Sequence, residues 1–166
     1  MMPASFLKIQ KYLHEQLGAA CSDFKVHAEG KEYSAASFRL ADFTIEFRVA
    51  KITPTKIGQF VTCWKRGGSG VTMPYDVTDR IDFFIIGVVK DEQVGFFLFP
   101  QKTLQVHNII SDYGKGGKRG FRVYPLWDTP DNKQAIATQS WQKNYFIWME
   151  PHKNIDRAVL QKIMIG

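Results

Sequence analysis

Apolar side chains in residues 5–17 are spaced as on one face of an amphipathic helix. They recur at intervals of three and four positions, at Phe6, Ile9, Leu13 and Leu17. Ser5 is available as an N-cap, and Gly18 is a typical residue at a helix end. The sequence therefore predicts a helix near the start of the chain.

From residue 37 the pattern changes to short β-favouring segments. Residues 37–40 and 44–50 are separated by a turn-like tripeptide, so they predict a hairpin. Residues 81–89 and 94–100 are apolar at nearly every position, which is typical of strands that are covered on both faces. We expect these two strands, joined through the polar residues 90–93, to form the middle of a sheet.

The segment between the hairpin and the central strands allows two structures. Thr53 and Pro54 could begin a helix whose apolar face carries Ile57, Phe60, Val61 and Trp64. Gly58 and the β-favouring residues 60–64 favour a strand almost as strongly. Further segments are predicted in chain order: a loop at 73–76, a loop at 111–120, a strand at 121–124, a helix at 132–146, and a helix at 155–165 capped by Asn154.

The composition is that of an ordinary globular protein. Of the 166 residues, 45% are hydrophobic and 23% are charged, so we expect a single domain over residues 1–166. The apolar runs are too short to span a bilayer, and no secretory signal is recognisable. Cys21 and Cys63 lie far apart, which indicates reduced thiols in a cytoplasmic protein. The predicted fold is α/β (α+β), with a mixed central β-sheet flanked by helices.

Positive charge is concentrated in two segments of a chain whose formal net charge is +6. Residues 48–66 contain five basic side chains and no acid, and residues 101–127 contain five against Asp112 alone. Such clusters can neutralise the phosphates of a polyanion, although a solvated basic surface has the same composition. The Gly-rich residues 114–120 match neither a P-loop nor a dinucleotide fingerprint, and we interpret them as a mobile basic loop.

Two groups of residues could support metal-dependent cleavage of phosphodiesters, in which acids hold a divalent cation and a Lys positions water. Glu46 and Arg48 fall on one side of a predicted strand, and Lys51 follows them. Alternatively, Asp82 begins one central strand, and Lys102 follows the end of the next. Both groups also have a structural interpretation, as a strand-surface ion pair and as a strand-start cap. The scattered histidines do not predict a metal site.

Several motifs of the chain resemble those of the MepB-like family. They are residues 47–61, the tripeptide Trp64-Lys65-Arg66, residues 95–100 with Lys102, and residues 118–125. The resemblance implies a fold similar to the PD-(D/E)XK nuclease core, and it implies binding to nucleic acid. It also implies a degraded catalytic motif, because Pro100 stands at the Glu position if Asp82 and Lys102 match the Asp and the Lys.

The leading hypothesis is a nucleic-acid-binding protein without catalytic activity, with single-stranded DNA or RNA favoured. The expected nucleic-acid contacts are Arg48, Lys51, Lys56, Trp64, Lys65, Arg66, Lys102, Lys118, Arg119, Arg122, Tyr124 and Trp141. The first alternative is an active nuclease that requires Mg²⁺ or Mn²⁺ and uses Glu46 or Asp82 with Lys51 or Lys102. The second alternative is a regulatory protein that binds an acidic protein partner. No resident metal, small-molecule cofactor or membrane partner is predicted.

Overall fold

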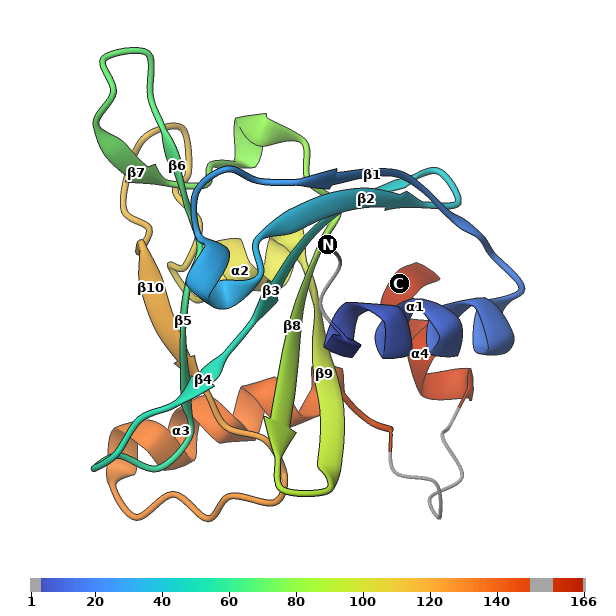
Figure 1. Cartoon of the computed structure of the whole chain (residues 1–166). Helices are drawn as coiled ribbons and strands as arrows, with labels where there is room; N and C mark the ends of the chain where they lie inside the picture. Colours follow the sequence, from blue (N-terminus) through green and yellow to red (C-terminus); the bar gives the residue numbers. More distant parts are fainter. Residues whose placement is uncertain (1–3, 150–156, 166) are drawn as a thin grey trace.

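The large β-sheet has a mixed topology (Figure 1). The computed structural model describes residues 4–149 and 157–165, and within them this sheet has six strands. In order across the sheet, the strands are β1 (Cys21–Val26), β2 (Ala36–Leu40), β3 (Phe43–Val49), β8 (Phe83–Lys90), β9 (Gln93–Pro100) and β11 (Phe146–Trp148). β3 and β8 are parallel, and the other neighbouring pairs are antiparallel.

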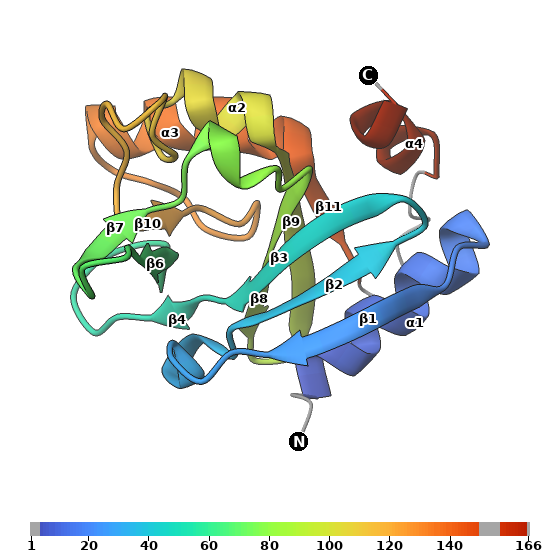
Figure 2. The ribbon, with the colours of Figure 1, turned by 90° about the horizontal axis from the view of Figure 1, so that it is seen from above.

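Helices cover both faces of the large sheet (Figure 2). α1 (Ala4–Leu17) and α4 (Arg157–Ile165) lie on one face, whereas α2 (Gln101–Val106) and α3 (Lys133–Gln142) lie on the other. This arrangement confirms the predicted fold class, a mixed central sheet flanked by helices. None of the helices within the described residues is both long enough and apolar enough to span a bilayer.

Two hydrophobic cores lie on opposite faces of the sheet, and alternate residues of the central strands divide between them. Along β8, Ile85 belongs to the core beneath α1, whereas Ile86 belongs to the core on the α2 side. Phe96 and Phe97 of β9 divide in the same way. This double burial explains why both strands are apolar at nearly every position. Their central place in the sheet confirms the prediction.

Two small sheets extend the molecule on the α3 side (Figure 1). One consists of β10 (Gly120–Val123), β5 (Gln59–Thr62) and β4 (Lys51–Ile52). In the other, β6 (Trp64–Arg66) pairs with β7 (Thr72–Pro74).

These strands decide between the two structures that the sequence allowed, and the helix beginning at Thr53 is wrong. Val61 and Cys63 are buried, whereas their neighbours along the strand are partly exposed. A burial period of two fits strand pairing and does not fit a helical face. β7 also corrects the loop predicted at residues 73–76, because Met73 pairs with Lys65 across the hairpin.

The predicted helix at residues 132–146 begins correctly but ends too late. Asn132 is its N-cap and accepts a hydrogen bond from the Ala135 amide at 2.9 Å. α3 ends at Gln142 because a 3₁₀ turn follows, and Phe146 then pairs with β9. β1, α2 and β11 were not predicted. α4 lies where the last helix was expected, and its proposed cap, Asn154, lies outside the described residues.

Candidate nucleic-acid interface

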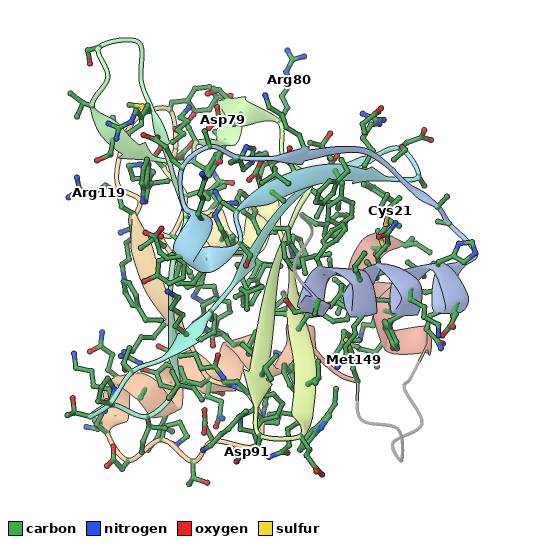
Figure 3. The ribbon with its side chains drawn as sticks, viewed as in Figure 1. Cys21, Asp79, Arg80, Asp91, Arg119 and Met149 are labelled. Atoms are coloured by element: carbon green, nitrogen blue, oxygen red, sulfur yellow. The ribbon has the colours of Figure 1, made fainter. Side chains whose placement is uncertain are left out.

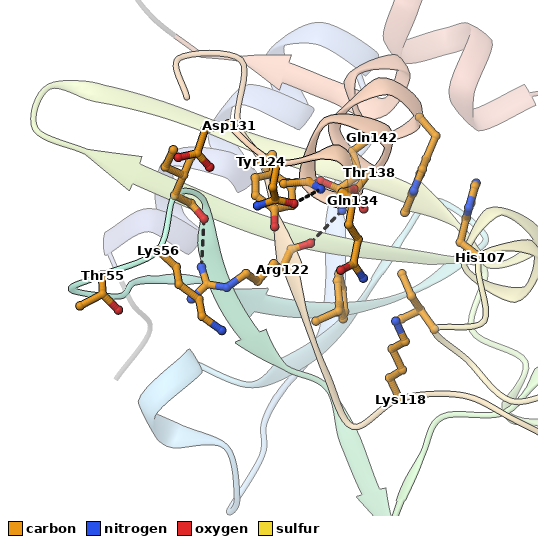
Figure 4. Close-up of a pocket in the computed structure, with 16 residues that line it drawn as sticks. Thr55, Lys56, His107, Lys118, Arg122, Tyr124, Asp131, Gln134, Thr138 and Gln142 are labelled. Carbon is orange, nitrogen blue, oxygen red and sulfur yellow. Dashed lines mark hydrogen bonds between the residues drawn. The ribbon is translucent and has the colours of Figure 1, made fainter. Parts of the chain in front are cut away.

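Five of the nine cations predicted to bind nucleic acid line two separate cavities, and they do not gather in one. The larger, which we call the β10–α3 cavity, has a volume of about 600 Å³ and lies between β10, α3 and the loop between β4 and β5 (Figure 4). Its lining includes three basic side chains and one acid: Lys56, Lys118, Arg122 and Asp131. Tyr124 and Trp141 from the predicted set also line it.

Arg122 holds one wall of the β10–α3 cavity in place. Its guanidinium donates to the Ile57 carbonyl oxygen at 3.2 Å (Figure 4). It also donates to the Thr53 hydroxyl. Both acceptors lie in the loop that carries Lys56. Arg122 therefore fixes the loop from which Lys56 reaches the cavity, in addition to lining the cavity itself.

Gln142 joins the two elements at the back of the cavity. Its buried side chain accepts a hydrogen bond from the Tyr124 amide at 2.8 Å and donates to the Arg122 carbonyl at 2.9 Å. The neighbouring Gln139 donates to the carbonyls of Tyr124, Pro125 and Asp128. These bonds satisfy backbone groups beyond the strand ladder, and they join α3 to β10 and to the segment that follows it.

A stacked pair of rings lines the cavity on the α2 side. The rings of His107 and Trp141 are parallel within 6°, with centroids 3.8 Å apart. Burial lowers the pKa of His107, which favours the neutral imidazole. Burial likewise raises the pKa of Tyr124. His107 was missed by sequence reasoning, because an isolated histidine has no spacing signal.

The smaller cavity, which we call the β1–β6 cavity, has a volume of about 480 Å³. Its lining contains Arg48, Trp64 and Lys65 from the predicted set, together with residues not predicted, among them Lys25, His27, Glu29 and Tyr75. Lys65 pairs at 2.7 Å with Asp79, which lies in the 3₁₀ helix η2 (Val77–Asp79) beside the β6–β7 hairpin (Figure 3). Arg66 pairs with Glu29 at 2.6 Å.

A buried ion pair lies at the base of the β1–β6 cavity. Arg48 Nη1 donates to Glu46 Oε2 at 2.9 Å, and the two side chains are only 4% and 8% exposed. His27 Nε2 and the Tyr75 hydroxyl lie 3.1 and 3.3 Å from the same carboxylate oxygen. The predicted placement of Glu46 and Arg48 on one side of a strand is correct, but the pair is buried and does not lie on a strand surface.

In this cluster the charges lie on the Glu46–Arg48 pair, and the neighbouring Cys63 thiol is uncharged. Burial opposes the charge of Arg48, but the acidic groups of Cys63, Glu46 and Tyr75 outweigh it and hold the Arg48 pKa above its usual range. Burial raises the pKa of Cys63 to about 11. Cys63 is therefore a protonated core residue and not a nucleophile.

The outward face of β5 and β6 runs between the two cavities. Lys51, Phe60 and Arg122 lie side by side in one row across the three-stranded sheet. Tyr33 packs edge-on against Phe60, and the Lys51 ammonium lies 5.2 Å from the Tyr33 ring centroid. Because side chains alternate along a strand, Thr62 and Trp64 continue this face into the β1–β6 cavity. Tyr33 and Phe60 were not predicted as site residues.

The catalytic candidates Asp82 and Lys102 make separate contacts. Asp82 accepts a hydrogen bond from the Thr44 amide at 2.8 Å, which is the strand-start role that the sequence also allowed. Lys102 is exposed on α2, with its ammonium 3.5 Å from the Gln105 side chain. Among residues 4–149 and 157–165, no group of three His, Cys, Asp or Glu side chains is placed to hold a metal ion.

Comparison with known proteins identifies the family of the chain. The model of the MepB-like family matches residues 27–148. The chain belongs to the MepB-like family. Its structure is similar to the crystal structure of MepB, with a TM-score of 0.78 and 34% sequence identity over 92% of this chain and 100% of that one. No curated protein shows significant similarity to the chain. The match to the MepB-like family includes the lining of both cavities except Lys25.

The basic Gly-rich loop of this MepB-like protein is fastened at several points. The Asp76 carboxylate accepts hydrogen bonds from Ser111 at 2.6 Å, from the Gly114 amide at 2.9 Å and from Thr78 at 2.7 Å. Near the other end of the loop, Arg119 donates to the Thr72 hydroxyl. These contacts do not support the interpretation of a mobile closing loop, and they hold Lys118 at the β10–α3 cavity.

We expect Asp76→Ala to lower the free energy of unfolding by about 1–3 kcal/mol at neutral pH, because buried donors lose their charged acceptor. Burial raises the Asp76 pKa, but the hydrogen bonds from Ser111, Gly114 and Thr78 outweigh it and lower that pKa well below its usual range. A carboxyl group whose pKa is lowered by folding stabilises the folded state at pH values above its pKa in the unfolded chain, about 4. This stabilisation is lost as the pH falls through the pKa of the group in the folded state.

Urea unfolding at pH 7 and at lower pH tests this expectation. The difference between wild type and Asp76→Ala should shrink as the pH falls below about 4. Glu92→Ala, in the exposed turn between β8 and β9, is the control and should change stability little. An equal loss of stability in both variants would show that Asp76 does not hold the loop.

Proposed function

We propose that this protein binds single-stranded nucleic acid, with the β10–α3 cavity as its principal site. The observation that supports this function most directly is the meeting of Lys56, Lys118 and Arg122 with the stacked His107 and Trp141 rings at one cavity. Cationic side chains suit a phosphate backbone, and aromatic rings suit bases.

The charges at the cavity favour an anionic ligand. The three cations of its lining face a single acid, Asp131, and Lys56 and Lys118 have no ion pair within the part of the chain that the structure describes. The N-terminal turn of α3 also borders the cavity, and its backbone dipole favours negative charge there.

A single strand fits this site better than a duplex. The cavity is a recess of about 600 Å³ that an unpaired base can enter, whereas a base in a duplex stays stacked between its neighbours. The row of Lys51, Phe60 and Arg122 extends the same chemistry over the small sheet, where Phe60 and Tyr33 offer further rings. We therefore place the strand across β10 and β5.

Fluorescence anisotropy with labelled single-stranded DNA and RNA at several salt concentrations tests this function. With about 4–6 phosphate contacts, the logarithm of the binding constant should fall with the logarithm of salt with a slope of roughly −3 to −4. The double variant Lys56→Gln/Lys118→Gln should weaken binding and make the slope shallower by about 1.4. Absence of binding even at low salt would disprove the proposal.

The matched control is Lys8→Gln/Lys11→Gln, which removes the same charge from exposed positions of α1 on the other face of the sheet. An equal change in both double variants would indicate a net-charge effect and no defined site. Cleavage with Mg²⁺ or Mn²⁺ that is lost in Asp82→Ala or Lys102→Ala would favour the nuclease alternative. Co-purification of an acidic protein without oligonucleotide binding would favour the partner-binding alternative.

A further inference from the structure

We infer that the β1–β6 cavity binds a phosphate dianion, the charged group shared by inorganic phosphate and the phosphorylated end of a nucleic-acid strand. The inference rests on the side chains of this second cavity. It depends on the proposed function only if the bound group is the end of a strand.

Arg48 supplies donors at the base of the cavity. A guanidinium has five N–H groups, and Arg48 uses three of them, toward Glu46, the Phe47 carbonyl and the Tyr75 hydroxyl. Its two other N–H groups have no hydrogen bond to any described residue. The side chain is 4% exposed and lines the cavity, so a ligand there could satisfy these donors. Guanidinium N–H groups match the geometry of phosphate oxygens.

Lys25 and His27 supply further donors at the rim. Lys25 on β1 is exposed, lines the cavity and has no ion pair within the part of the chain that the structure describes. His27 uses Nε2 toward the Glu46 carboxylate. Its Nδ1 has no described partner and becomes a donor when the imidazole is protonated. The two rim side chains and Arg48 therefore line one cavity with groups that can donate to a compact anion.

The carboxylates near the cavity do not oppose such a ligand strongly, because each is already paired. Glu46 is paired with Arg48, Asp79 with Lys65 at 2.7 Å, and Glu29 with Arg66 at 2.6 Å. The positive charge left after these pairings is that of Lys25, to which His27 adds when its imidazole is protonated. A small site with this surplus charge and a preformed guanidinium suits one phosphate group better than an extended backbone.

The outward face of β5 and β6 connects this cavity to the proposed strand path. Arg122 lines the first cavity and pairs in register with Phe60, while Thr62 and Trp64 line the second. A strand that crosses the small sheet would therefore bring its end toward Lys25 and Arg48. A terminal phosphate carries more negative charge than an internal phosphodiester, and charge-assisted hydrogen bonds would favour it there.

Two measurements test the inference and separate the two sources of phosphate. Thermal unfolding in about 10 mM inorganic phosphate, against chloride at the same ionic strength, should show a rise in Tm of about 2–4 °C. Anisotropy with otherwise identical oligonucleotides should show about 5- to 10-fold tighter binding of the phosphorylated one. A response to inorganic phosphate alone assigns the site to the free anion, and a response to the terminal phosphate alone assigns it to the strand end.

The variants Lys25→Gln and His27→Gln should abolish either response. Both residues lie at the rim, and a Gln at position 27 can still donate to Glu46, so folding should be retained. Lys56→Gln/Lys118→Gln at the β10–α3 cavity should weaken oligonucleotide binding but keep the response to inorganic phosphate. The inference is overturned if neither phosphate source has an effect, or if the effect persists in the Lys25 and His27 variants.

Discussion

Replacing Glu46 by Leu is expected to lower the free energy of unfolding by about 3–5 kcal/mol, the loss typical when a buried charge is left without its partner. The two side chains of the Glu46–Arg48 pair are 8% and 4% exposed, and burial of Arg48 is tolerated because Glu46 lies 2.9 Å away. The variant would also remove the acceptor shared by His27 and Tyr75. Guanidinium chloride unfolding measures the loss.

The double variant Glu46→Leu/Arg48→Met is the matched control. It replaces both charges by apolar side chains, and replacement of a whole buried pair is often neutral or stabilising. We therefore expect the double variant to recover much of the stability that Glu46→Leu loses. A double variant less stable than Glu46→Leu would show that Arg48 contributes through its other contacts, the Phe47 carbonyl and the Tyr75 hydroxyl, more than through the pair.

Gly58→Ala is expected to destabilise the protein by about 2–5 kcal/mol and to weaken oligonucleotide binding at the same time. Gly58 has φ +83°, where an L-residue is strained, and an added Cβ would lie 2.7 Å from the Tyr124 ring. Relief of this clash would move either the loop that carries Lys56 or the ring that lines the β10–α3 cavity. Thermal unfolding and anisotropy should therefore change together.

Gly68→Ala is the control for the glycine variant. A Cβ at Gly68, in the β6–β7 turn, would meet no atom within 4 Å, and its φ is not in the left-handed region. We expect this variant to unfold and bind as the wild type does. If Gly58→Ala lost stability but kept full affinity, Tyr124 and the 53–58 loop would not belong to the binding site.

Secondary structure with a strong periodic signal could be predicted, and segments that depend on a distant partner could not. α1 and the strands β8 and β9 follow from the spacing or density of apolar residues in the sequence itself. β5 was ambiguous, because residues 60–64 suit either a strand or a helical face, and the pairing with β10 decides it. β1 and β11 are the edge strands of the large sheet, and their sequences carry no clear alternation.

The part of the candidate site that depends on local geometry alone was also predictable. Glu46 and Arg48 are two positions apart on one strand, so their meeting needs only local geometry. His27, Tyr75 and His107 were missed, because each lies far along the chain from the residue that it contacts. His27 and Tyr75 contact Glu46, and His107 stacks on Trp141. Asp82 begins one central strand and Lys102 follows the end of the next, yet their side chains make separate contacts.

The sequence by itself determined the fold class, the central strands, the MepB-like family and the two basic segments, because these depend on composition, period and local motifs. The tertiary structure alone decided how the basic residues are grouped. It places Lys56, Lys118 and Arg122 at one cavity and Arg48 and Lys65 at another. Glu46 neutralises Arg48, and Asp79 neutralises Lys65. The physical reason is that charge along a chain is additive, whereas the field at a site depends on which opposite charges the fold brings within hydrogen-bonding distance.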